Sequence, residues 1–386
     1  MNKQEAIPGG MPVAEFLESY WQKKPCLLRQ AFPGFKADFD QGALLALAHD
    51  EAVESRLVLE QDGDYPWQVL HGPFQTGELD YLPQSHWSLL VQNAELHLPS
   101  AHQLLQHFCF IPNWRIDDLM ISYAADSGSV GPHLDSYDVF LLQAAGKREW
   151  AINTDDFDES NFIDDLDLRI IDNFRAEEKF TLEAGDMLYL PPGVAHHGIA
   201  IGESITCSIG FRAPSSQELL AHFVDEVLQE SPDQRYSDPD LVPREHCGEI
   251  STEELAGIER LFRSSLPDAS ALATWFGRYV SQAPESLRDA EPSAQMNQAE
   301  MLLNLKSSRL LVKSASVRSV FIRKDDGLVL FANGIDYFLN LEFSGFVYDF
   351  CSKHKIDNPL HGLDTPADKL AKVIQELYLR GLLSTE

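Results

Sequence analysis

The feature that most constrains this chain is a succession of short β-rich segments between Ile116 and Pro214. Gly, Pro and Asp residues separate the segments, which read LMISYA, DVFLLQ, REWAIN, KFTLEAGDMLYL, HHGIAI and SITCSIGFR. Several of them alternate apolar and polar residues, and many short strands at this spacing are typical of a β-sandwich or a jelly-roll barrel. We interpret Ala145-Gly146 as a turn between two strands, and the stretch 155–186 as a strongly acidic insertion in the barrel.

The rest of the chain is predicted to be mainly helical, which makes the fold class α+β. After Pro214 the segment QELLAHFVDEVLQE carries an apolar stripe at helical spacing, and Ser251 and Glu254 have the spacing of a capping box. The predicted domains are a jelly-roll barrel domain at 1–214, a helical domain at 215–283, a linker at 284–298 and a C-terminal domain at 299–386. That last domain combines helices with a hairpin at an Asp-Gly turn, which suggests a winged-helix module.

Charge and cysteine usage restrict the partners and the compartment. The chain has 60 acidic and 30 basic residues, a net charge of −30, which should repel nucleic acid and attract a basic protein. The same charge could instead serve solubility alone. Five cysteines without a C-x-x-C pair argue against disulfides and structural zinc, so we expect a reducing cytoplasm. No secretion signal or membrane span is expected from the sequence.

Two separated motifs predict a metal site. In Gly131-Pro132-His133-Leu134-Asp135, the side chains of His133 and Asp135 would share one face of a strand. In the second motif a strand and a Pro-Pro-Gly turn lead directly into His196. Two histidines and one carboxylate on one face of an octahedral ion leave three positions open, as in non-haem Fe(II) oxygenases. His197 is an alternative ligand, but adjacent strand residues point to opposite faces, so only one of the two can bind.

A basic pair follows one strand later. A co-substrate such as 2-oxoglutarate would fill two of the open positions and dioxygen the third, and its far carboxylate would need a fixed cation. Lys147 and Arg148 are both candidates. Arg offers a planar two-point contact and Lys a point charge, and spacing alone does not choose between them.

At this point the chain resembles a known family. GPHLDSYDVFLLQAAGKREW, GDMLYLPPGVAHHG and SIGFRAP are similar to the JmjC-type ribosomal oxygenases, especially the bacterial branch that hydroxylates an arginine of a large-subunit ribosomal protein. The resemblance also covers WQKKPCLLR, SRLVLEQDG, HGPF, WSLLVQ and WRIDDLMISY, and extends more loosely into the C-terminal third.

The resemblance implies a role for each of several residues. It implies iron ligation by His133, Asp135 and His196, and 2-oxoglutarate binding by Arg148 and Ser122. It further implies a homodimer through the helical middle. The segments that match the family's substrate pocket carry three residues, Asp118, Tyr137 and Ser208. Each of the three also has a plain structural reading, as a turn cap, a core side chain or a buried strand serine.

We therefore predict a cytoplasmic Fe(II)- and 2-oxoglutarate-dependent protein hydroxylase that uses dioxygen and acts on an arginine of a basic ribosomal protein. One alternative is a related JmjC oxygenase acting on histidine or methyl-lysine. Another is a non-catalytic cupin-like regulator whose C-terminal module binds DNA, although direct nucleic-acid binding is not expected for so acidic a chain.

Overall fold

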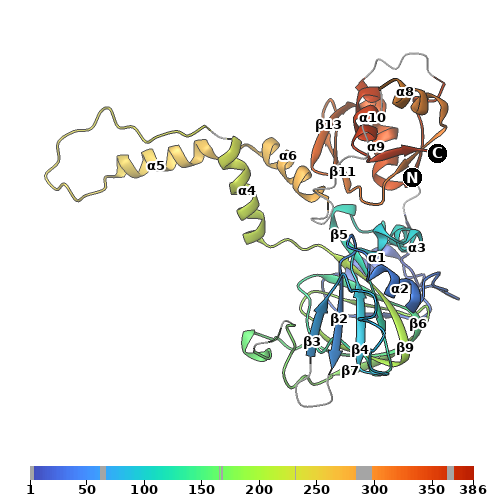
Figure 1. Cartoon of the computed structure of the whole chain (residues 1–386). Coiled ribbons are helices and arrows are strands. Elements are labelled where there is room, and N and C mark those ends of the chain that lie inside the picture. Colours follow the sequence, from blue (N-terminus) through green and yellow to red (C-terminus); the bar gives the residue numbers. More distant parts are fainter. Residues whose placement is uncertain are drawn as a thin grey trace. The chain divides into compact units, whose positions relative to one another are not determined.

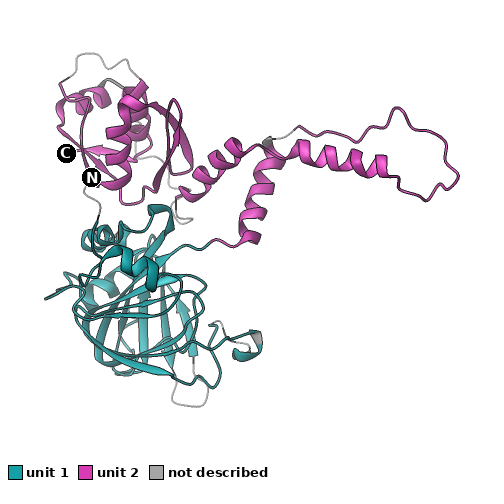
Figure 2. Ribbon diagram, turned by 180° about the vertical axis from the view of Figure 1, so that it is seen from behind, with its two compact units in different colours: residues 1–213 teal, residues 214–386 magenta. Residues whose placement is uncertain are grey.

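The structure is a computed structural model that describes residues 4–60, 67–164, 166, 168–230, 232–283, 298–362 and 369–386. The chain divides into two compact units, residues 1–213 and 214–386, which are coloured separately in Figure 2. Within the described residues, no helix combines the length and the apolar character needed to cross a membrane.

The first unit is dominated by strands, and Figure 1 shows them wrapped into a barrel. Its strands are β1 Cys26–Leu28, β2 Ser55–Glu60, β3 Trp67–His71, β4 Trp87–Val91, β5 Ile116–Ala124, β6 Asp138–Asn153, β7 Glu178–Glu183, β8 Met187–Leu190 and β9 Ala195–Phe211. Its α-helices are α1 Val13–Ser19, α2 Gln41–Leu47 and α3 Pro99–Leu105. Short 3-10 turns are η1 Ala94–Leu96, η2 Gln106–Phe108, η3 Asn113–Arg115 and η4 Glu159–Asn161.

These strands form one antiparallel sheet in the order β1-β8-β6-β9-β5-β4-β2-β3, with β7 also paired to β6. The two longest strands, β6 and β9, pair along most of their length. The first half of β6 also pairs with β8 and its second half with β7. The antiparallel strand architecture predicted from the β-rich segments is therefore present.

The predicted turn at Ala145-Gly146 is wrong, because β6 runs through it as one strand. Ala145 pairs with Ile205 and Lys147 with Ile201, so β9 carries the extra residues of an irregular bulge. Gly146 has φ 68°, and a Cβ there would overlap the carbonyl oxygen of Glu203. Its turn-like sequence thus reflects a close backbone approach where both strands bend together.

Alternation along the strands separates a core face from a pocket face. On β9, Cys207 and Ile209 belong to the main apolar core, whereas Thr206 and Ser208 line a pocket. Aromatic rings fill much of that core; Phe140 lies 4.9 Å from Tyr189 and 5.1 Å from Phe108 between ring centroids. This dense layer holds β6 and β9 rigidly beneath the pocket.

The predicted acidic insertion is shorter than 155–186, because β7 at Glu178–Glu183 is part of the sheet. Its described part between β6 and β7 includes η4 and an isolated bridge between Phe162 and Ile171.

The second unit contains helices and two small sheets. Its helices are α4 Ser216–Glu230, α5 Thr252–Ser265, α6 Ala269–Val280, α8 Gln298–Ser307, α9 Ser344–Ser352 and α10 Lys369–Leu379, with the 3-10 turn η5 Leu341–Phe343. Its strands are β10 Leu310–Lys313, β11 Ser319–Lys324, β12 Gly327–Ala332, β13 Ile335–Asn340, β14 Lys355–Asp357 and β15 Leu383–Thr385. The sheets have the orders β14-β10-β15 and β11-β12-β13.

The helix cap and the hairpin predicted for this unit are confirmed. The capping box of Ser251 and Glu254 opens α5, and the hairpin β11–β12 turns at Asp325-Asp326. The linker predicted at 284–298 falls outside the described residues except for Gln298, where α8 begins.

Candidate metal and co-substrate site

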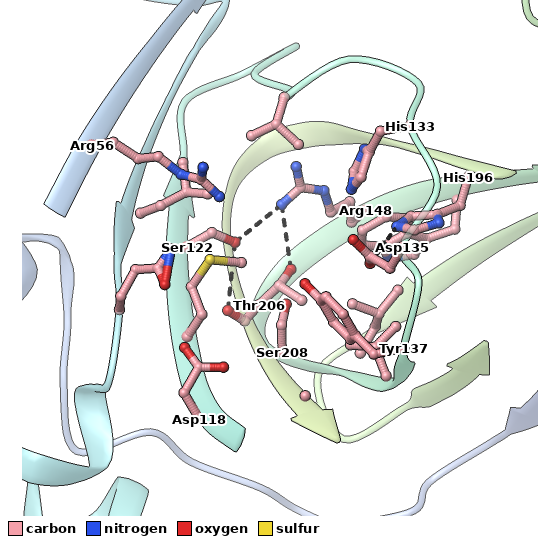
Figure 3. Close-up of a pocket in the computed structure, with 18 residues that line it drawn as sticks. Arg56, Asp118, Ser122, His133, Asp135, Tyr137, Arg148, His196, Thr206 and Ser208 are labelled. Atoms are coloured by element: carbon pink, nitrogen blue, oxygen red, sulfur yellow. Dashed lines mark hydrogen bonds and ion pairs between the residues drawn. The ribbon is translucent and has the colours of Figure 1, made fainter. Parts of the chain in front are cut away.

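The inward-facing side chains of the sheet and of the loop before β6 form one pocket, drawn in Figure 3. Alternation along β5, β6 and β9 decides which side chains reach it. The lining residues are Asp118, Met120, Ser122, Val139, Leu141, Arg148, Trp150, His196, Thr206, Ser208 and Gly210 from these strands, with Val130, His133, Asp135, Tyr137, Arg56, Leu90 and Gln92 around them.

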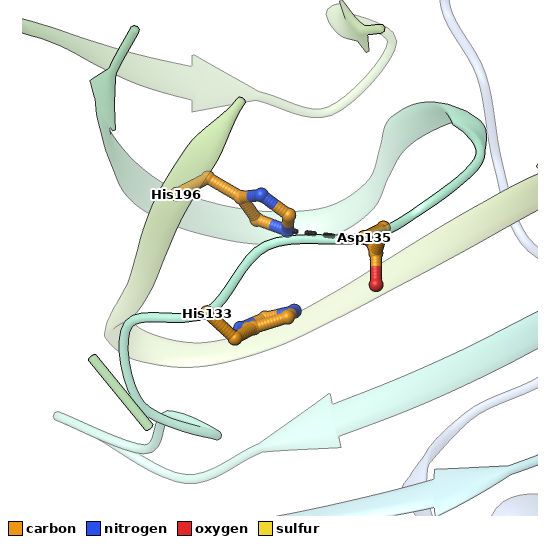
Figure 4. Close-up of side chains that lie close together, drawn as sticks. All are labelled: His133, Asp135 and His196. Carbon is orange, nitrogen blue, oxygen red and sulfur yellow. Dashed lines mark ion pairs between the residues drawn. The ribbon is translucent and has the colours of Figure 1, made fainter. Parts of the chain in front are cut away.

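Three potential ligands meet on one wall of the pocket (Figure 4). Single ligand atoms of His133, Asp135 and His196 all lie within 4.8 Å of one another. The Nε2 of His196 is 3.7 Å from the Oδ2 of Asp135, and the two imidazole centroids are 4.3 Å apart. His196 is the second residue of β9, but His133 lies in the loop rather than in the regular strand that the sequence suggested.

Backbone contacts hold the loop that carries His133 and Asp135. His133 pairs with His196 through an isolated bridge, and Gly193 donates its N–H to the carbonyl of Asp135 at 2.8 Å. Gly131 has φ 81° and donates to the Ser129 hydroxyl at 3.1 Å. The loop is thus fixed at several points.

Both imidazoles are oriented for ligation. The Nδ1 of His133 is 2.9 Å from the Gly131 carbonyl, and the Nδ1 of His196 is 3.0 Å from the Val194 carbonyl. A carbonyl only accepts, so each Nδ1 carries the proton and each Nε2 offers a lone pair. Burial and the neighbouring His133 lower the pKa of His196 to about 4, which keeps this ring neutral at physiological pH.

The donor set fits a divalent iron ion. Two neutral imidazoles and one carboxylate that leave one side open form the arrangement used by non-haem Fe(II) oxygenases. His197 does not line this pocket; its ring lies edge-on to Phe174, with a centroid separation of 6.1 Å. The neighbouring histidines therefore face different surroundings, as strand alternation predicts.

Arg148 lies across the pocket and is 2% exposed. Its guanidinium donates to Ser122 Oγ at 3.4 Å, Thr206 Oγ1 at 3.5 Å and the Gly198 carbonyl at 3.3 Å, all long contacts. Its Nε has no partner, and it forms no ion pair with any carboxylate in the described part of the chain. Burial lowers its pKa to about 10, so it stays charged near neutral pH. A buried cation without a counter-charge is suited to an anionic ligand.

Lys147 has a different environment. Its Nζ lies 2.6 Å from Glu183 Oε1 and the side chain is about half exposed. It does not line the pocket, so of the two cations that spacing left open, only Arg148 faces the predicted metal ligands.

The sequence reasoning missed Thr206 and Gly198, which shape the space around Arg148. Thr206 pairs with Ser122 across β5 and β9, so their hydroxyls approach the same guanidinium. A Cβ on Gly198 would lie 2.7 Å from Arg148 Nε and 2.6 Å from the Trp150 ring. Alternation in SITCSIGFR could have indicated Thr206, but the need for glycine at 198 is visible only once β6 and β9 are paired.

The residues predicted for substrate binding also face the pocket. Asp118 projects from β5, Ser208 from β9 and Tyr137 from the end of the metal loop (Figure 3). Burial, with a smaller effect of Asp117, raises the pKa of Asp118 to about 6. Tyr137 donates to Asp135, and burial raises its pKa. Arg56, not singled out from the sequence, is a second cation on the lining, and its Nε has no partner.

Comparison with known proteins identifies the family. A family model described as JmjC domain matches residues 103–219. The chain is 39% identical over 322 residues to the ribosomal protein uL16 3-hydroxylase of Escherichia coli, covering 83% of this chain and 84% of that protein. The chain belongs to the JmjC ribosomal oxygenase family.

Solved structures of this family match nearly the whole chain. The X-ray structure of the Escherichia coli ribosomal oxygenase YcfD has a TM-score of 0.85 and 35% identity, covering 97% of this chain and 98% of that one. A second YcfD structure, in complex with cobalt and 2-oxoglutarate, has a TM-score of 0.81, 34% identity and the same coverage. The ribosomal oxygenase fold therefore confirms the predicted JmjC/cupin barrel.

Proposed function

We propose that this chain is an Fe(II)- and 2-oxoglutarate-dependent oxygenase that hydroxylates an arginine of a large-subunit ribosomal protein. One observation carries the proposal: the grouped His133, Asp135 and His196 share one pocket with the buried guanidinium of Arg148, which has no carboxylate partner among the described residues and whose Nε makes no hydrogen bond. The YcfD complex with cobalt and 2-oxoglutarate supports it, because that relative holds a divalent metal together with this co-substrate.

Each residue has a role that follows from its position. His133, Asp135 and His196 would hold the iron, the two histidines through Nε2 in their fixed tautomers and Asp135 through a carboxylate oxygen. Arg148 would bind the far carboxylate of 2-oxoglutarate, with hydroxyls of Ser122 and Thr206 beside it. Apolar side chains of Val139, Leu141 and Met120 also line the pocket and would limit the access of water to the bound co-substrate. When bound, the iron supplies the chemistry that couples 2-oxoglutarate decarboxylation to hydroxylation of a C–H bond, with dioxygen as oxidant.

The substrate side of the pocket favours a cationic side chain. The carboxylate of Asp118 and the hydroxyls of Tyr137 and Ser208 would bind a guanidinium, whose N–H groups need several acceptors. The relative in Escherichia coli is a uL16 3-hydroxylase, which makes ribosomal protein uL16 the first substrate to test. The chain's net charge of −30 suits such a basic partner, which would be met in the cytoplasm.

The test combines two readouts with purified protein, Fe(II), 2-oxoglutarate and uL16. We expect succinate formation that depends on uL16, and intact-mass analysis should show that uL16 gains one oxygen at an arginine. Peptides carrying histidine or methyl-lysine separate the related JmjC activities. Absence of succinate under all conditions would favour the non-catalytic regulator instead.

We further propose that residues 215–283 form a homodimerisation domain and that residues 299–386, after the predicted linker, form a winged-helix-like domain. Support for the dimer comes from large apolar side chains that are exposed on α4 and α5: Leu220, Leu228 and Phe262 are 60%, 73% and 68% exposed. Support for the C-terminal domain comes from its β11–β12–β13 hairpins beside α9 and α10. Light scattering after size-exclusion chromatography tests the dimer, and Phe262→Asp should shift it to monomer.

A further inference from the structure

The strand that carries Asp118 contains a bulge at that residue. Ile116 of β5 pairs with Phe211 of β9, but Leu119 pairs with Ile209, so two residues of β5 lie opposite Gly210 alone. The extra residue changes which face each side chain occupies. Ile116 and Leu119 both pack on the main core, whereas Asp118 lines the pocket. From Asp118 onward the alternation is regular, because Met120 and Ser122 also line the pocket, so Asp118 lies where the regular ladder to β9 ends and the bulge begins.

The segment after β4 holds the bulge from one side. β4 ends at Val91, opposite Ile121, so it offers no partner residue to Leu119. Asn93 adopts a left-handed conformation with φ 48°, which turns the chain into η1. From there a carboxyl oxygen of Glu95 accepts the Leu119 N–H at 3.0 Å. Glu95 thus supplies the acceptor that a longer β4 would have provided.

A second hydrogen bond runs between the same two segments. The backbone N–H of Asn93 donates to the Asp118 carboxylate, so η1 and the bulge exchange one bond in each direction. Gly210 bounds Asp118 on the other side, because a Cβ there would lie 3.3 Å from Asp118 Oδ1 and 3.6 Å from the Tyr137 ring. Asp118 is therefore confined between η1 and β9.

Glu95 is suited to hold the bulge without disturbing the charge of the pocket. It is 7% exposed and does not line the pocket. Burial raises its pKa to about 8, so at neutral pH the group is largely protonated and adds little negative charge beside Asp118. The neutral amide of glutamine keeps a comparable acceptor, whereas methionine has a similar length and no oxygen.

We propose that Glu95 is a positioning residue for substrate recognition, which holds the β5 bulge so that Asp118 points at the side chain to be hydroxylated. This inference rests on the proposed substrate role of Asp118. It predicts that Glu95 affects only the binding of the protein substrate. The proposed iron ligands and Arg148 lie on β6, β9 and the metal loop, and Ser122 lies on β5 beyond Leu119, so the Glu95 hydrogen bond reaches none of them directly.

The experiment measures KM and kcat for an arginine peptide of uL16, together with KM for 2-oxoglutarate, in full-length protein loaded with Fe(II). Glu95→Met should raise the peptide KM about tenfold, as expected from an unsatisfied buried donor, while the KM for 2-oxoglutarate and the iron content stay unchanged. Glu95→Gln should restore the peptide KM to within about twofold of the wild type. Gly210→Ala, which presses on Asp118 from the opposite side, should raise the peptide KM as well.

Asp186→Asn is the matched control. Asp186 is 3% exposed and accepts the Gln30 N–H at 2.8 Å, so it is also a buried carboxyl that fixes a backbone segment, but it does not line the pocket. This variant should keep the wild-type peptide KM even if it lowers the melting temperature. An equal rise in KM for Asp186→Asn and Glu95→Met would overturn the proposal, because general loosening would explain both.

The remaining outcomes separate this inference from the proposed function. If Asp118→Asn raises the peptide KM and Glu95→Met does not, the inference is wrong and the function stands. Should Glu95→Gln behave like Glu95→Met, the hydrogen bond to Leu119 is not the cause and the inference is again wrong. If Asp118→Asn leaves the peptide KM unchanged, the substrate role of Asp118 fails and the inference fails with it. If Glu95→Met does not fold, Gly210→Ala decides, and an unchanged peptide KM there overturns the proposal.

Discussion

His133 and His196 donate their backbone N–H groups to each other's carbonyl oxygens, at 3.0 Å and 2.8 Å. Two proposed ligands that lie far apart in sequence are therefore joined by a pair of backbone hydrogen bonds, whose atoms are retained when either side chain is replaced by alanine. Single replacements should leave the bridge, and hence the barrel, in place while removing one metal ligand.

The first prediction follows for the metal. His133→Ala and His196→Ala should each lose stoichiometric iron and all 2-oxoglutarate turnover, because the site then retains too few ligands. His197→Ala should keep both, since that ring contacts Phe174 rather than the pocket. Metal analysis of the purified variants checks this. Loss of iron from His197→Ala with retention in His196→Ala would reverse the ligand assignment.

The second prediction concerns Arg148. A hydrogen bond to a charged group contributes about 1.5–3 kcal/mol, so Arg148→Ala should weaken 2-oxoglutarate binding roughly ten- to a hundredfold or more while iron stays bound. Lys147→Ala is the control, because Lys147 pairs with Glu183 outside the pocket and its loss should leave the affinity unchanged. Anaerobic calorimetric titration measures both. Unchanged affinity in Arg148→Ala would mean that another group holds the far carboxylate.

The third prediction tests the space beside Arg148. Gly198→Ala would bring a Cβ to 2.7 Å from Arg148 Nε, so the guanidinium must move and 2-oxoglutarate affinity should fall at least about tenfold. Gly248→Ala has no heavy atom within 4 Å of the added Cβ and should have no effect. If Gly198→Ala binds 2-oxoglutarate as tightly as the wild type, the guanidinium position in the structure is not the binding position.

The fourth prediction concerns pH and stability. The pKa of Glu95 is raised from 4.5 to about 8 by burial, so between these values the folded protein binds more protons than the unfolded chain. The free energy of unfolding should therefore fall as pH rises through this window, by at most about 1.4 kcal/mol per pH unit from this group. Glu95→Gln removes that contribution. Urea unfolding of the metal-free protein at several pH values should show a shallower decline in the variant, and parallel curves would contradict the assignment.

The fifth prediction concerns association with the substrate. The net charge of −30 should steer a basic ribosomal protein towards this chain, and salt screens such steering beyond about 8–10 Å at physiological ionic strength. We expect the association rate with uL16 in stopped-flow measurements to fall as salt rises, with a smaller change in the dissociation rate. A rate that does not depend on salt would assign the charge to solubility alone.

Some features of the fold and of the site could be predicted from the sequence. Strand alternation predicted that His133 and Asp135 share one face, and the helix signals of the second unit were local. The choice of His196, Arg148 and Ser122 rested on the resemblance to the family. Non-local relationships could not be read in the same way. In the sequence Gly146 resembles a turn residue, and only the pairing of β6 with β9 shows that it lies within a strand. Glu95 resembles an ordinary surface acid, and its contact with β5 follows only from the end of β4 at Val91. These features depend on which strands meet and at what register, which no local window contains.

The pairing of β6 with β9 has a consequence for the co-substrate. Ile152 pairs with His196 and Arg148 with Ala200, so one continuous ladder carries both a proposed iron ligand and the proposed carboxylate partner. The distance between the backbones of His196 and Arg148 is fixed by the register of β6 against β9. It can change only if one strand slides past the other. If these proposed roles hold, the ladder would set the length of 2-oxo acid that fits: a dicarboxylate one carbon shorter or longer than 2-oxoglutarate would reach the iron or Arg148, but would not engage both without strain.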